Sequence, residues 1–408
     1  MPIHVFDLIN NSSGHVTVNL GTVLAIANAF PGTPLHVHGA TGHLAYWRND
    51  PALASVCFHE IEVCARHGWQ THLVSFRRFW HDFRLLRDAI AANPRNEPCL
   101  IFLLCASSTA VHAAALLARI PSRLVFVQVN LHGNLNDALS WRSRNPIRRA
   151  FDYISAFQAQ NPRVRFIVLE DAVRDEMARR MPDFVHRCDV MHHTVNTAEA
   201  AGREPPKLEY PIRIGLVGNA TEAKGLHPFL RLAARFTAAH GAKVEFHIVG
   251  GRPGDTDADL FRDIAHPVTV GHIPRAEFVE RMGRLHYVLL PLDASYYLLS
   301  PSGGLTDAIA WGRPILATPL PLVLDLFRKG GDIGRICGDV AAFEAALEEI
   351  IARPDAALHA RQAAAMLGLA RERSPEVVGE NYRQQTLAAF PELSATSAPG
   401  VAPLQVSA

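Results

Sequence analysis

The chain lacks the features that mark secreted, membrane-spanning or nucleic-acid-binding proteins. Its 40 Lys and Arg against 39 Asp and Glu leave a net charge of +1, which provides no bulk attraction for nucleic acid. No apolar run approaches the roughly 20 residues of a spanning helix, and the N-terminal MPIHVFDLIN has no basic stretch or cleavage site of a secretion signal. We expect a cytoplasmic protein that is at most peripheral on the inner face of a membrane.

Cysteine is also scarce. Six residues lie mostly in apolar runs without C-x-x-C spacing, at positions Cys57, Cys64, Cys99, Cys105, Cys188 and Cys337. This pattern indicates buried thiols in a reducing compartment, and it disfavours disulfides and metal ligation. His36, His38 and His43 are close in sequence, but alternation on a strand without a carboxylate or Cys partner is weak evidence for a metal. We expect no metal site.

A length of 408 residues favours two domains of about 200 residues each. The first half alternates apolar and amphipathic stretches. We predict strands at 3–9, 35–39, 70–76, 99–105, 124–130, 165–169 and 189–193, and helices at 17–30, 51–67, 108–119 and 172–181. Such alternation predicts an α/β fold, with an open parallel sheet covered by helices on both faces. Ligands of these sheets bind beyond the carboxyl ends of the strands.

Pro, Gly and charge interrupt this pattern at Thr197–Pro211, which we interpret as a linker. Strands are then predicted at 212–217, 244–249 and 268–271, and helices at 226–239 and 374–390. The predicted domains are 1–200, a linker at 201–211, a second domain at 212–373, a last helix at 374–390 and a disordered tail at 391–408.

Residues Leu285–Thr318 form the most informative stretch. An apolar run predicts a buried strand, a loop ends in Ser300–Gly304, and a short helix at 305–311 precedes a second strand at 315–318. Ser302, Gly303 and Gly304 would place unpaired N–H groups at a helix N-terminus, which suits a phosphate or diphosphate. A plain Ser/Gly helix cap is the alternative.

The sequence GLTDAIAWGRPI at Gly304–Ile315 resembles the nucleotide-sugar signature of GT-B glycosyltransferases, especially the family-4 retaining group. The resemblance implies two Rossmann-like parallel-sheet domains that face a central cleft. It also implies that Asp307, on the second acidic position, binds the donor ribose, with Thr306 beside it. The first acidic position, which holds the donor sugar, falls near Leu299 or Ser300 and is not acidic here.

A second loop supports the same resemblance. The sequence GNATEAKG at Gly218–Gly225 is similar to the family's Gly-Arg-x-x-x-x-Lys-Gly, whose cations bind the donor diphosphate. Lys224 matches, whereas Asn219 replaces the Arg. From the residues alone, a loop lysine is more often solvated. The resemblance further places His272, after the strand at 268–271, in the loop that cradles the nucleobase.

In the first half, two strand ends carry candidates. Asn10–His15 alone predicts a solvated turn, but the resemblance implies a glycine loop facing the donor phosphates, with Gly14 and His15 as donor-binding residues. His132 follows the strand at 124–130, where many family members carry a histidine beside the sugar-transfer centre. A lone histidine is as often structural. The family pattern also makes 192–196 the end of the first domain and returns the last helix to that domain.

Two stretches mix aromatic and cationic side chains, at 77–87 and 141–149. Such basic amphipathic segments lie on anionic lipid, although a charged helix face is usually just solvated. They favour a lipid-linked acceptor and an anionic membrane surface as a partner.

The implied function is retaining transfer of a sugar from a nucleoside diphosphate sugar to a hydroxyl of a glycan or lipid-linked acceptor. His132 and Lys224 are the catalytic candidates, and Lys224 with the helix N-terminus would stabilise the leaving diphosphate. No metal or cofactor is expected, and bacterial-type surface polysaccharide or lipid-linked glycan assembly is the implied setting. A nucleotide-sugar epimerase of the same architecture, or a non-catalytic GT-B partner subunit, remains an alternative.

Overall fold

The chain is organised as two compact units. The computed structural model describes residues 1–11, 15–63, 72–131, 135, 139, 144–254 and 256–396. The first unit comprises Met1–Val168, Met181–Met191 and the chain from Gly379, and the second comprises Leu169–Arg180 and His192–Val378. Residues 197–211 contain no helix or strand and belong to the second unit.

The first unit is built on a parallel sheet in the order β3-β2-β1-β4-β5-β6-β7. Its strands are β1 Ile3–Asp7, β2 Leu35–Gly39, β3 Cys57–Glu60, β4 Cys99–Cys105, β5 Val125–Asn130, β6 Val164–Val168 and β7 Cys188–Val190. All seven residues of β4 are buried, as expected for a strand covered on both faces. The strand order reverses between β1 and β4, which makes this pair the topological switch point.

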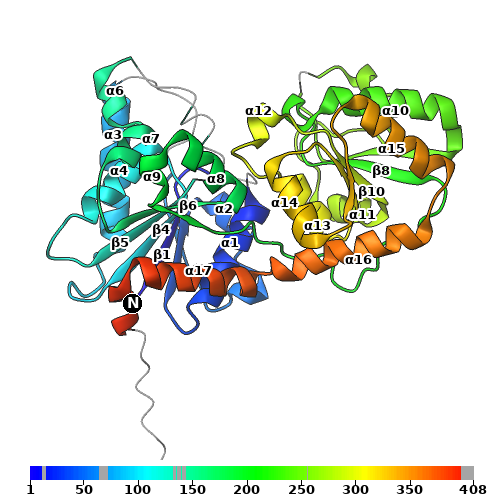
Figure 1. Ribbon diagram of the computed structural model, residues 1–408. Helices are drawn as coiled ribbons and strands as arrows, with labels where there is room; N and C mark the ends of the chain where they lie inside the picture. Colours follow the sequence, from blue (N-terminus) through cyan, green and yellow to red (C-terminus); the bar gives the residue numbers. More distant parts are fainter. Residues whose placement is uncertain are drawn as a thin grey trace, which may run out of the picture. The chain divides into compact units, whose positions relative to one another are not determined.

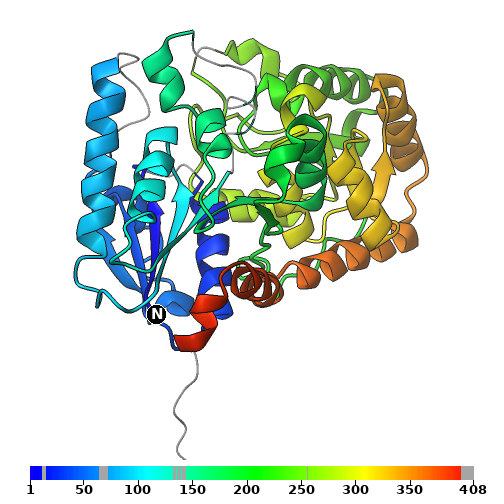
Figure 2. The ribbon, with the colours of Figure 1, turned by 60° about the vertical axis from the view of Figure 1, so that its left-hand side comes forward.

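Helices cover both faces of this sheet. The helices α3, α4 and α7 lie on one face, and α1 and α17 lie on the other (Figure 1, and from a second side in Figure 2). The described helices of this unit are α1 Val16–Ala29, α2 Thr41–Leu44, α3 His72–Ala89, α4 Ser108–Leu117, α6 Pro146–Ala150, α7 Tyr153–Gln158, α9 Pro182–Val185 and most of α17 Pro375–Ala389. The predicted α/β arrangement is confirmed.

Two predicted elements of the first unit are wrong. The described part of the helix predicted at 51–67, residues 51–63, contains instead the 3₁₀ turn Pro51–Leu53 and the edge strand β3, which pairs with β2. Of the strand predicted at 70–76, residues 72–76 lie in α3, which begins at His72, and residues 70 and 71 lie outside the described residues. The edge strand β3 has only four residues, and none of them is buried. It therefore lacks the buried apolar run that identifies inner strands, and hydrogen bonds to β2 hold it in the sheet. Cys57 on β3 is accordingly exposed and not buried, whereas Cys64 lies outside the described residues.

The C-terminal helix α17 is fixed to the first sheet by buried polar contacts. Gln128 on β5 is fully buried; its amide donates to the Thr386 hydroxyl at 3.0 Å and accepts from the Tyr382 hydroxyl. Gln385 satisfies the edge strand β7, accepting from the N–H of Val190 at 3.0 Å and donating to its carbonyl at 2.8 Å. These buried groups are therefore paired, as a stable core requires. Beyond α17, Pro391–Thr396 forms a 3₁₀ helix, and 397–408 lie outside the described residues.

Four histidines form a stack across β1, β2 and β3, which we call the histidine stack: His4, His36, His38 and His59. His4 Nδ1 lies 3.1 Å from His38 Nε2, and His36 Nδ1 lies 3.0 Å from His59 Nε2. Burial, reinforced by the neighbouring histidines, lowers the pKa of His4 to about 4 and that of His38 to about 2. Among the described residues, no group of His, Cys, Asp or Glu is arranged to hold a metal ion. The histidines therefore pack as neutral rings.

The second unit contains a parallel sheet in the order β12-β11-β10-β8-β9. Its strands are β8 Ile212–Val217, β9 Val244–Val249, β10 Tyr287–Leu290, β11 Ile315–Ala317 and β12 Gly334–Ile336. Its helices are α8 Asp171–Arg180, α10 Leu226–His240, α11 Arg275–Arg284, α12 Ala294–Tyr297, α13 Gly303–Ala310, α14 Pro321–Gly330, α15 Val340–Ala352 and α16 Ala356–Glu372. The strand predicted at 268–271 forms only a single bridge, between Val270 and Arg252.

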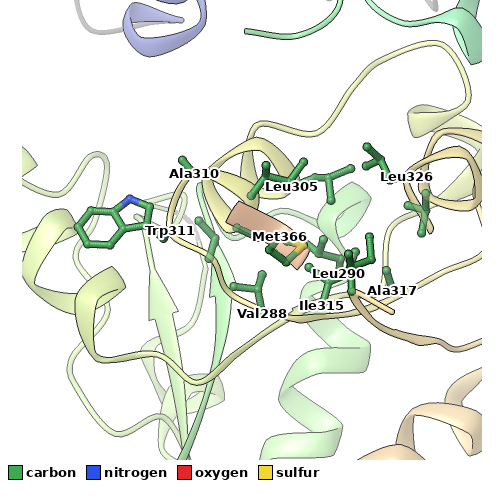
Figure 3. Close-up of a cluster of buried hydrophobic side chains, with 14 of the residues drawn as sticks. Val288, Leu290, Leu305, Ala310, Trp311, Ile315, Ala317, Leu326 and Met366 are labelled. Atoms are coloured by element: carbon green, nitrogen blue, oxygen red, sulfur yellow. The ribbon is translucent and has the colours of Figure 1, made fainter. Parts of the chain in front are cut away.

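Alternating side chains of these strands fill two separate cores. Leu289 of β10 packs in the core under α10 and α15. Its neighbours Val288 and Leu290 point to the opposite face, where they join Leu305 of α13 and Met366 of α16 (Figure 3). Because successive side chains on a strand alternate between faces, one apolar run supplies both cores. This arrangement leaves the carboxyl ends of the strands as the open edge.

The histidine stack predicts a pH-dependent stability. Because the folded-state pKa values of His4 and His38 lie below the ordinary value of 6.5, the unfolded chain binds more protons, so stability is full above pH 6.5 and falls below it. The loss should reach up to about 1.4 kcal/mol per pH unit for each such histidine between pH 6.5 and 4. Denaturant unfolding at pH 7 and pH 5 measures it. Tryptophan fluorescence suits this test, since four of the five tryptophans lie within residues 1–168.

Replacing His38 by Gln should flatten this pH dependence, while His186→Gln, at an exposed position of the same unit, should leave it unchanged. Equal pH dependence in all three proteins would exclude the stack as its source.

Candidate functional site

Backbone hydrogen bonds connect the loops that follow β8, β9 and β10 in the second sheet. The N–H of Ala220, after β8, donates to the carbonyl of Gly251, after β9, at 2.8 Å. The N–H of Asp293, after β10, donates to the carbonyl of Ala223 at 2.9 Å. Since parallel strands end at the same edge, these bonds bring the predicted loops at 218–225 and 291–304 together.

Glycine is required where these loops approach most closely. A Cβ on Gly218, whose φ is +87°, would lie 2.1 Å from the Lys224 ammonium nitrogen. A Cβ on Gly304, in the first turn of α13, would lie 2.7 Å from the carbonyl oxygen of Val217. A larger residue at Gly304 would therefore push α13 away from the end of β8, whereas one at Gly218 would displace the Lys224 ammonium.

Lys224 is not a solvated lysine. Its side chain is half-buried, and its ammonium donates to the carbonyl of Val217, the last residue of β8, at 3.0 Å. Burial lowers the pKa of Lys224, and the nearby carboxylate of Asp307 opposes that shift. The structure therefore places the predicted cation at the end of the strand, close to Asp307.

Asp307 lies beyond the first turn of its helix. The helix begins at Gly303, two residues earlier than predicted, with Ser302 as N-cap and no acidic residue in its first turn. Asp307 is half-buried, and burial raises its pKa to about 6, against the opposing charges of Arg275 and Lys224 and with a smaller contribution from Glu199. Its position does not suit a simple partner of the helix dipole, which acts within the first turn.

Arg275 is the charged residue that the sequence analysis missed. It begins α11, directly after the loop that contains His272, and pairs with Glu199 through two hydrogen bonds, one of 2.7 Å. Its guanidinium lies 4.2 Å from the centre of the Phe278 ring. Burial opposes it, but the pairing with Glu199 and the charge of Asp307 raise the pKa of Arg275. Two cations therefore act on the Asp307 carboxylate: Lys224, which the family pattern predicts, and Arg275, which it does not.

A buried chain of contacts anchors the start of α13. The Thr306 hydroxyl lies 3.1 Å from Nδ1 of His193, which is 4% exposed. The N–H of His193 donates to Glu170 at 2.9 Å, and Glu170 forms a buried, doubly hydrogen-bonded ion pair with Arg373. Although burial opposes it, Arg373 lowers the pKa of Glu170. His193, expected only as part of a domain boundary, thus contacts the predicted site.

The remaining candidates differ in their surroundings. Asn219 and His272 are exposed on their loops, and Ser302 is buried without a side-chain capping bond to α13. A Cβ on Gly303 would meet nothing within 4 Å, so this position faces open space. These residues line the same strand ends as Lys224 and Asp307.

The first unit holds three further candidates. His15 is exposed at the N-cap of α1, with a left-handed φ of 57°. Gly14 and His132 lie outside the described residues.

Comparisons with known proteins include a family match that covers part of the second unit. Residues 211–353, which contain Lys224, Arg275 and Asp307, match the family described as glycosyl transferases group 1. Among curated proteins, none matches this chain in sequence.

Solved structures share the fold across nearly the whole chain. A glycosyltransferase from Rickettsia africae has a TM-score of 0.65 at 11% identity and covers 97% of this chain and 99% of its own. The HepE protein of Anabaena, solved with UDP-glucose, has a TM-score of 0.63 at 14% identity, with coverages of 96% and 100%. A trehalose-6-phosphate protein from E. coli, bound to UDP-2-fluoro glucose, has a TM-score of 0.61 at 12% identity, with coverages of 94% and 98%.

At these identities the likeness shows the fold, and the family match concerns residues 211–353 of the second unit. The chain therefore has the GT-B fold, matches glycosyl transferases group 1 over residues 211–353, and is a glycosyltransferase.

Proposed function

We propose that the enzyme transfers a sugar from a nucleoside diphosphate sugar to a hydroxyl acceptor with retention, as family-4 enzymes do. The observation that carries this proposal is the half-buried Asp307 between the charges of Lys224 and Arg275, next to the N-terminus of α13. Two proteins of the same fold were solved with UDP-linked sugars, which supports a nucleotide sugar as donor.

Each group has a distinct role in the proposal. Lys224 and the first N–H groups of α13 meet the diphosphate, since a helix N-terminus and an ammonium both favour negative charge. The Asp307 carboxylate accepts hydrogen bonds from the ribose hydroxyls, and the loop of His272 meets the base. Arg275 supplies a second cation near Asp307.

These groups act on the leaving group. In retaining transfer, the bond to the anomeric carbon breaks while negative charge grows on the departing diphosphate. Donors fixed in advance around that charge lower the barrier more than mobile water does. We propose that Lys224 and α13 supply this stabilisation without a metal or cofactor. His132 remains a proposed catalytic residue of the first unit.

The sugar end of the donor is held differently from the family pattern in this proposal. The position of the first acidic residue falls on Leu299 or Ser300, and both are buried. This departure is the feature that favours a non-catalytic subunit as the second candidate. Incubation with UDP-, GDP- and ADP-sugars and a panel of hydroxyl acceptors decides between them. A glycoside supports the transferase, an epimerised donor supports the epimerase, and donor binding without product supports the subunit.

We further propose that the enzyme acts at the inner face of a membrane on a lipid-linked glycan. The stacked aromatic residues of α3 join α6 through Phe79 and Phe151, whose ring centres are 5.5 Å apart. The exposed side chains Phe76, Arg77, Trp80, Ile147 and Arg149, together with the half-buried Arg148, form what we call the α3–α6 patch. Apolar and cationic groups together suit an anionic lipid surface. Within the described residues, no helix is long and apolar enough to cross a membrane.

Lys224→Ala should weaken nucleotide binding by about 1.5–3 kcal/mol, because a hydrogen bond to a charged group is lost. Calorimetry with the best-binding nucleoside diphosphate measures this change, after a thermal-shift screen has found that ligand. Lys243→Ala, at an exposed lysine of the same unit, is the matched control. Unchanged affinity in a folded Lys224 variant would remove Lys224 from the site.

Nucleotide affinity should fall as the pH drops through about 6, since Asp307 then takes up a proton and loses acceptor capacity. Asp307→Asn should bind weakly at all pH values and lack this step. The phosphates of the ligand also titrate, so the comparison uses one ligand with both proteins at each pH.

The Asn variant should lose affinity equally for the free nucleoside diphosphate and the intact donor, because Asp307 serves the nucleotide end. A loss confined to the sugar-bearing ligand would instead place Asp307 against the sugar.

Binding to vesicles of anionic lipid should fall when Arg77, Arg148 and Arg149 are replaced by Gln. It should also fall with salt, because charges at a surface are screened within about 8 Å at physiological ionic strength. The matched control replaces three exposed arginines elsewhere, Arg179, Arg262 and Arg328. Equal loss in both triple variants would show that the α3–α6 patch has no special affinity for lipid.

A further inference from the structure

Arg275 lies where the loop that contains His272 meets helix α11. A backbone contact fixes this loop at the edge of the second sheet, since the N–H of Gly271 donates to the carbonyl of Arg252, after β9, at 2.9 Å. Arg275 follows His272 by three residues and is the first residue of α11. Its charge also acts on the Asp307 carboxylate of α13. Arg275 is therefore next to the loop in sequence and close to Asp307 in space.

Two neighbours hold the Arg275 guanidinium in one orientation. Its Nε donates to Oε1 of Glu199 at 2.7 Å, and its Nη2 donates to Oε2 of the same carboxylate. The guanidinium carbon also lies 4.2 Å from the centre of the ring of Phe278, which is buried. A planar guanidinium that is paired on one side and stacked on a ring is pre-organised. Its remaining donors therefore have a fixed direction before a ligand binds.

The two bonds to Glu199 leave part of the guanidinium available. They use Nε and Nη2, and within the described residues Nη1 has no hydrogen-bond partner. The side chain of Arg275 is 44% exposed, so a ligand reaches it from solvent. A guanidinium carries N–H donors and no acceptor. Arg275 therefore offers the N–H groups of Nη1 to an acceptor on a ligand.

The charge of Arg275 indicates which part of a nucleotide it meets. Arg275 and Glu199 together are neutral, so the pair has no excess charge with which to attract a diphosphate. That role stays with Lys224 and the N-terminus of α13. The ribose is assigned to Asp307, and the family resemblance assigns the loop of His272 to the base. The base is thus the neutral, acceptor-bearing group next to Arg275.

We infer that Arg275 selects the base of the donor by donating from Nη1 to a ring carbonyl oxygen, and that Glu199 is its positioning residue. This role rests on the proposed nucleotide-sugar site of the second unit. Uracil and guanine present a carbonyl oxygen where cytosine and adenine present an amino donor. A guanidinium has no acceptor for that amino group. The enzyme therefore prefers an oxo base, uracil or guanine, over an amino base.

Two pairs of nucleotides test this preference in the unmodified protein. UDP and CDP share the ribose, the diphosphate and the ring size, and they differ in an oxo against an amino group. GDP and ADP give the same comparison for the larger ring. Calorimetry is done at pH 8, well above the pKa of Asp307 at about 6. In the ring size that binds more tightly, the oxo base should bind at least about tenfold better than the amino base.

Replacing Arg275 by Gln should bring this ratio of affinities close to one, because an amide offers both a donor and an acceptor. The lost charge near Asp307 affects every nucleotide alike, so the ratio reports on the base. Arg284→Gln is the matched control, since Arg284 lies exposed at the other end of α11 and also pairs with a glutamate. It should leave the ratio unchanged. A ratio unaltered by Arg275→Gln overturns the inference.

A second substitution covers the case in which Arg275→Gln does not fold. Arg275→Lys keeps the charge but loses the planar fork, so the ratio should still fall several-fold. A ratio equal to that of the parent overturns the inference.

The role of Glu199 is tested by the same ratio. Glu199→Ala removes both acceptors that orient Arg275, so the ratio should fall, whereas Glu199→Gln keeps one acceptor oxygen and should restore part of it. An exposed ion pair contributes little to stability, so the unfolding midpoint should stay close to that of the parent. A ratio that is equal in the parent and in Glu199→Ala excludes Glu199 as a positioning residue.

Failure of the donor site and failure of base selection give different results. Absence of nucleoside diphosphate binding by the parent overturns the donor site and the base selection that depends on it. Equal affinity for oxo and amino bases, or a preference for the amino base, overturns base selection alone. Lys224→Ala should weaken UDP and CDP by the same factor, because both carry the diphosphate, and so leave the ratio unchanged.

Discussion

Burial of parallel strands on both faces is the constraint on which the rest of the structure depends. In each sheet, backbone groups form hydrogen bonds with neighbouring strands, and side chains enter the cores under the helices. Leu289 enters one core of the second unit, and its neighbours Val288 and Leu290 enter the other. Polar chemistry is then left to the strand ends, where loops supply uncovered N–H groups and charged side chains. Lys224 in one unit and Arg78 in the other both lie at such an edge.

At the edge of the second sheet, burial and two neighbouring cations have opposite effects on the pKa of Asp307. Half-burial raises the pKa of Asp307, while Lys224 and Arg275 favour its ionised form. The ion pair between Glu170 and Arg373 is not part of this balance. It supports the start of α13, because Glu170 accepts from the N–H of His193 and the His193 ring contacts Thr306. Removing one partner of such a buried pair is strongly destabilising, because the other charge remains uncompensated.

Helix α3 combines two properties in the first unit. Its outer face exposes Phe76 and Trp80, whereas Arg78 and Asp82 face the ends of β1 and β4. A helix repeats every 3.6 residues, so adjacent residues such as Arg77 and Arg78 point in directions about 100° apart. One helix can therefore present an aromatic and cationic outer face together with an arginine beside the end of β1, and a count of basic residues does not distinguish them.

The sequence by itself determined the inner strands, because long apolar runs such as Cys99–Cys105 have no stable alternative to burial. Lys224 and Asp307 were predicted from local patterns that resemble the family's signature, and the structure places their charges close together. Only the tertiary structure decided the edge strand β3, which depends on pairing with β2, and the start of α13. It alone revealed Arg275 with Glu199, 76 residues apart, and His193 beside Thr306, 113 apart. Such contacts are selected by folding and leave no local periodicity for a sequence to display.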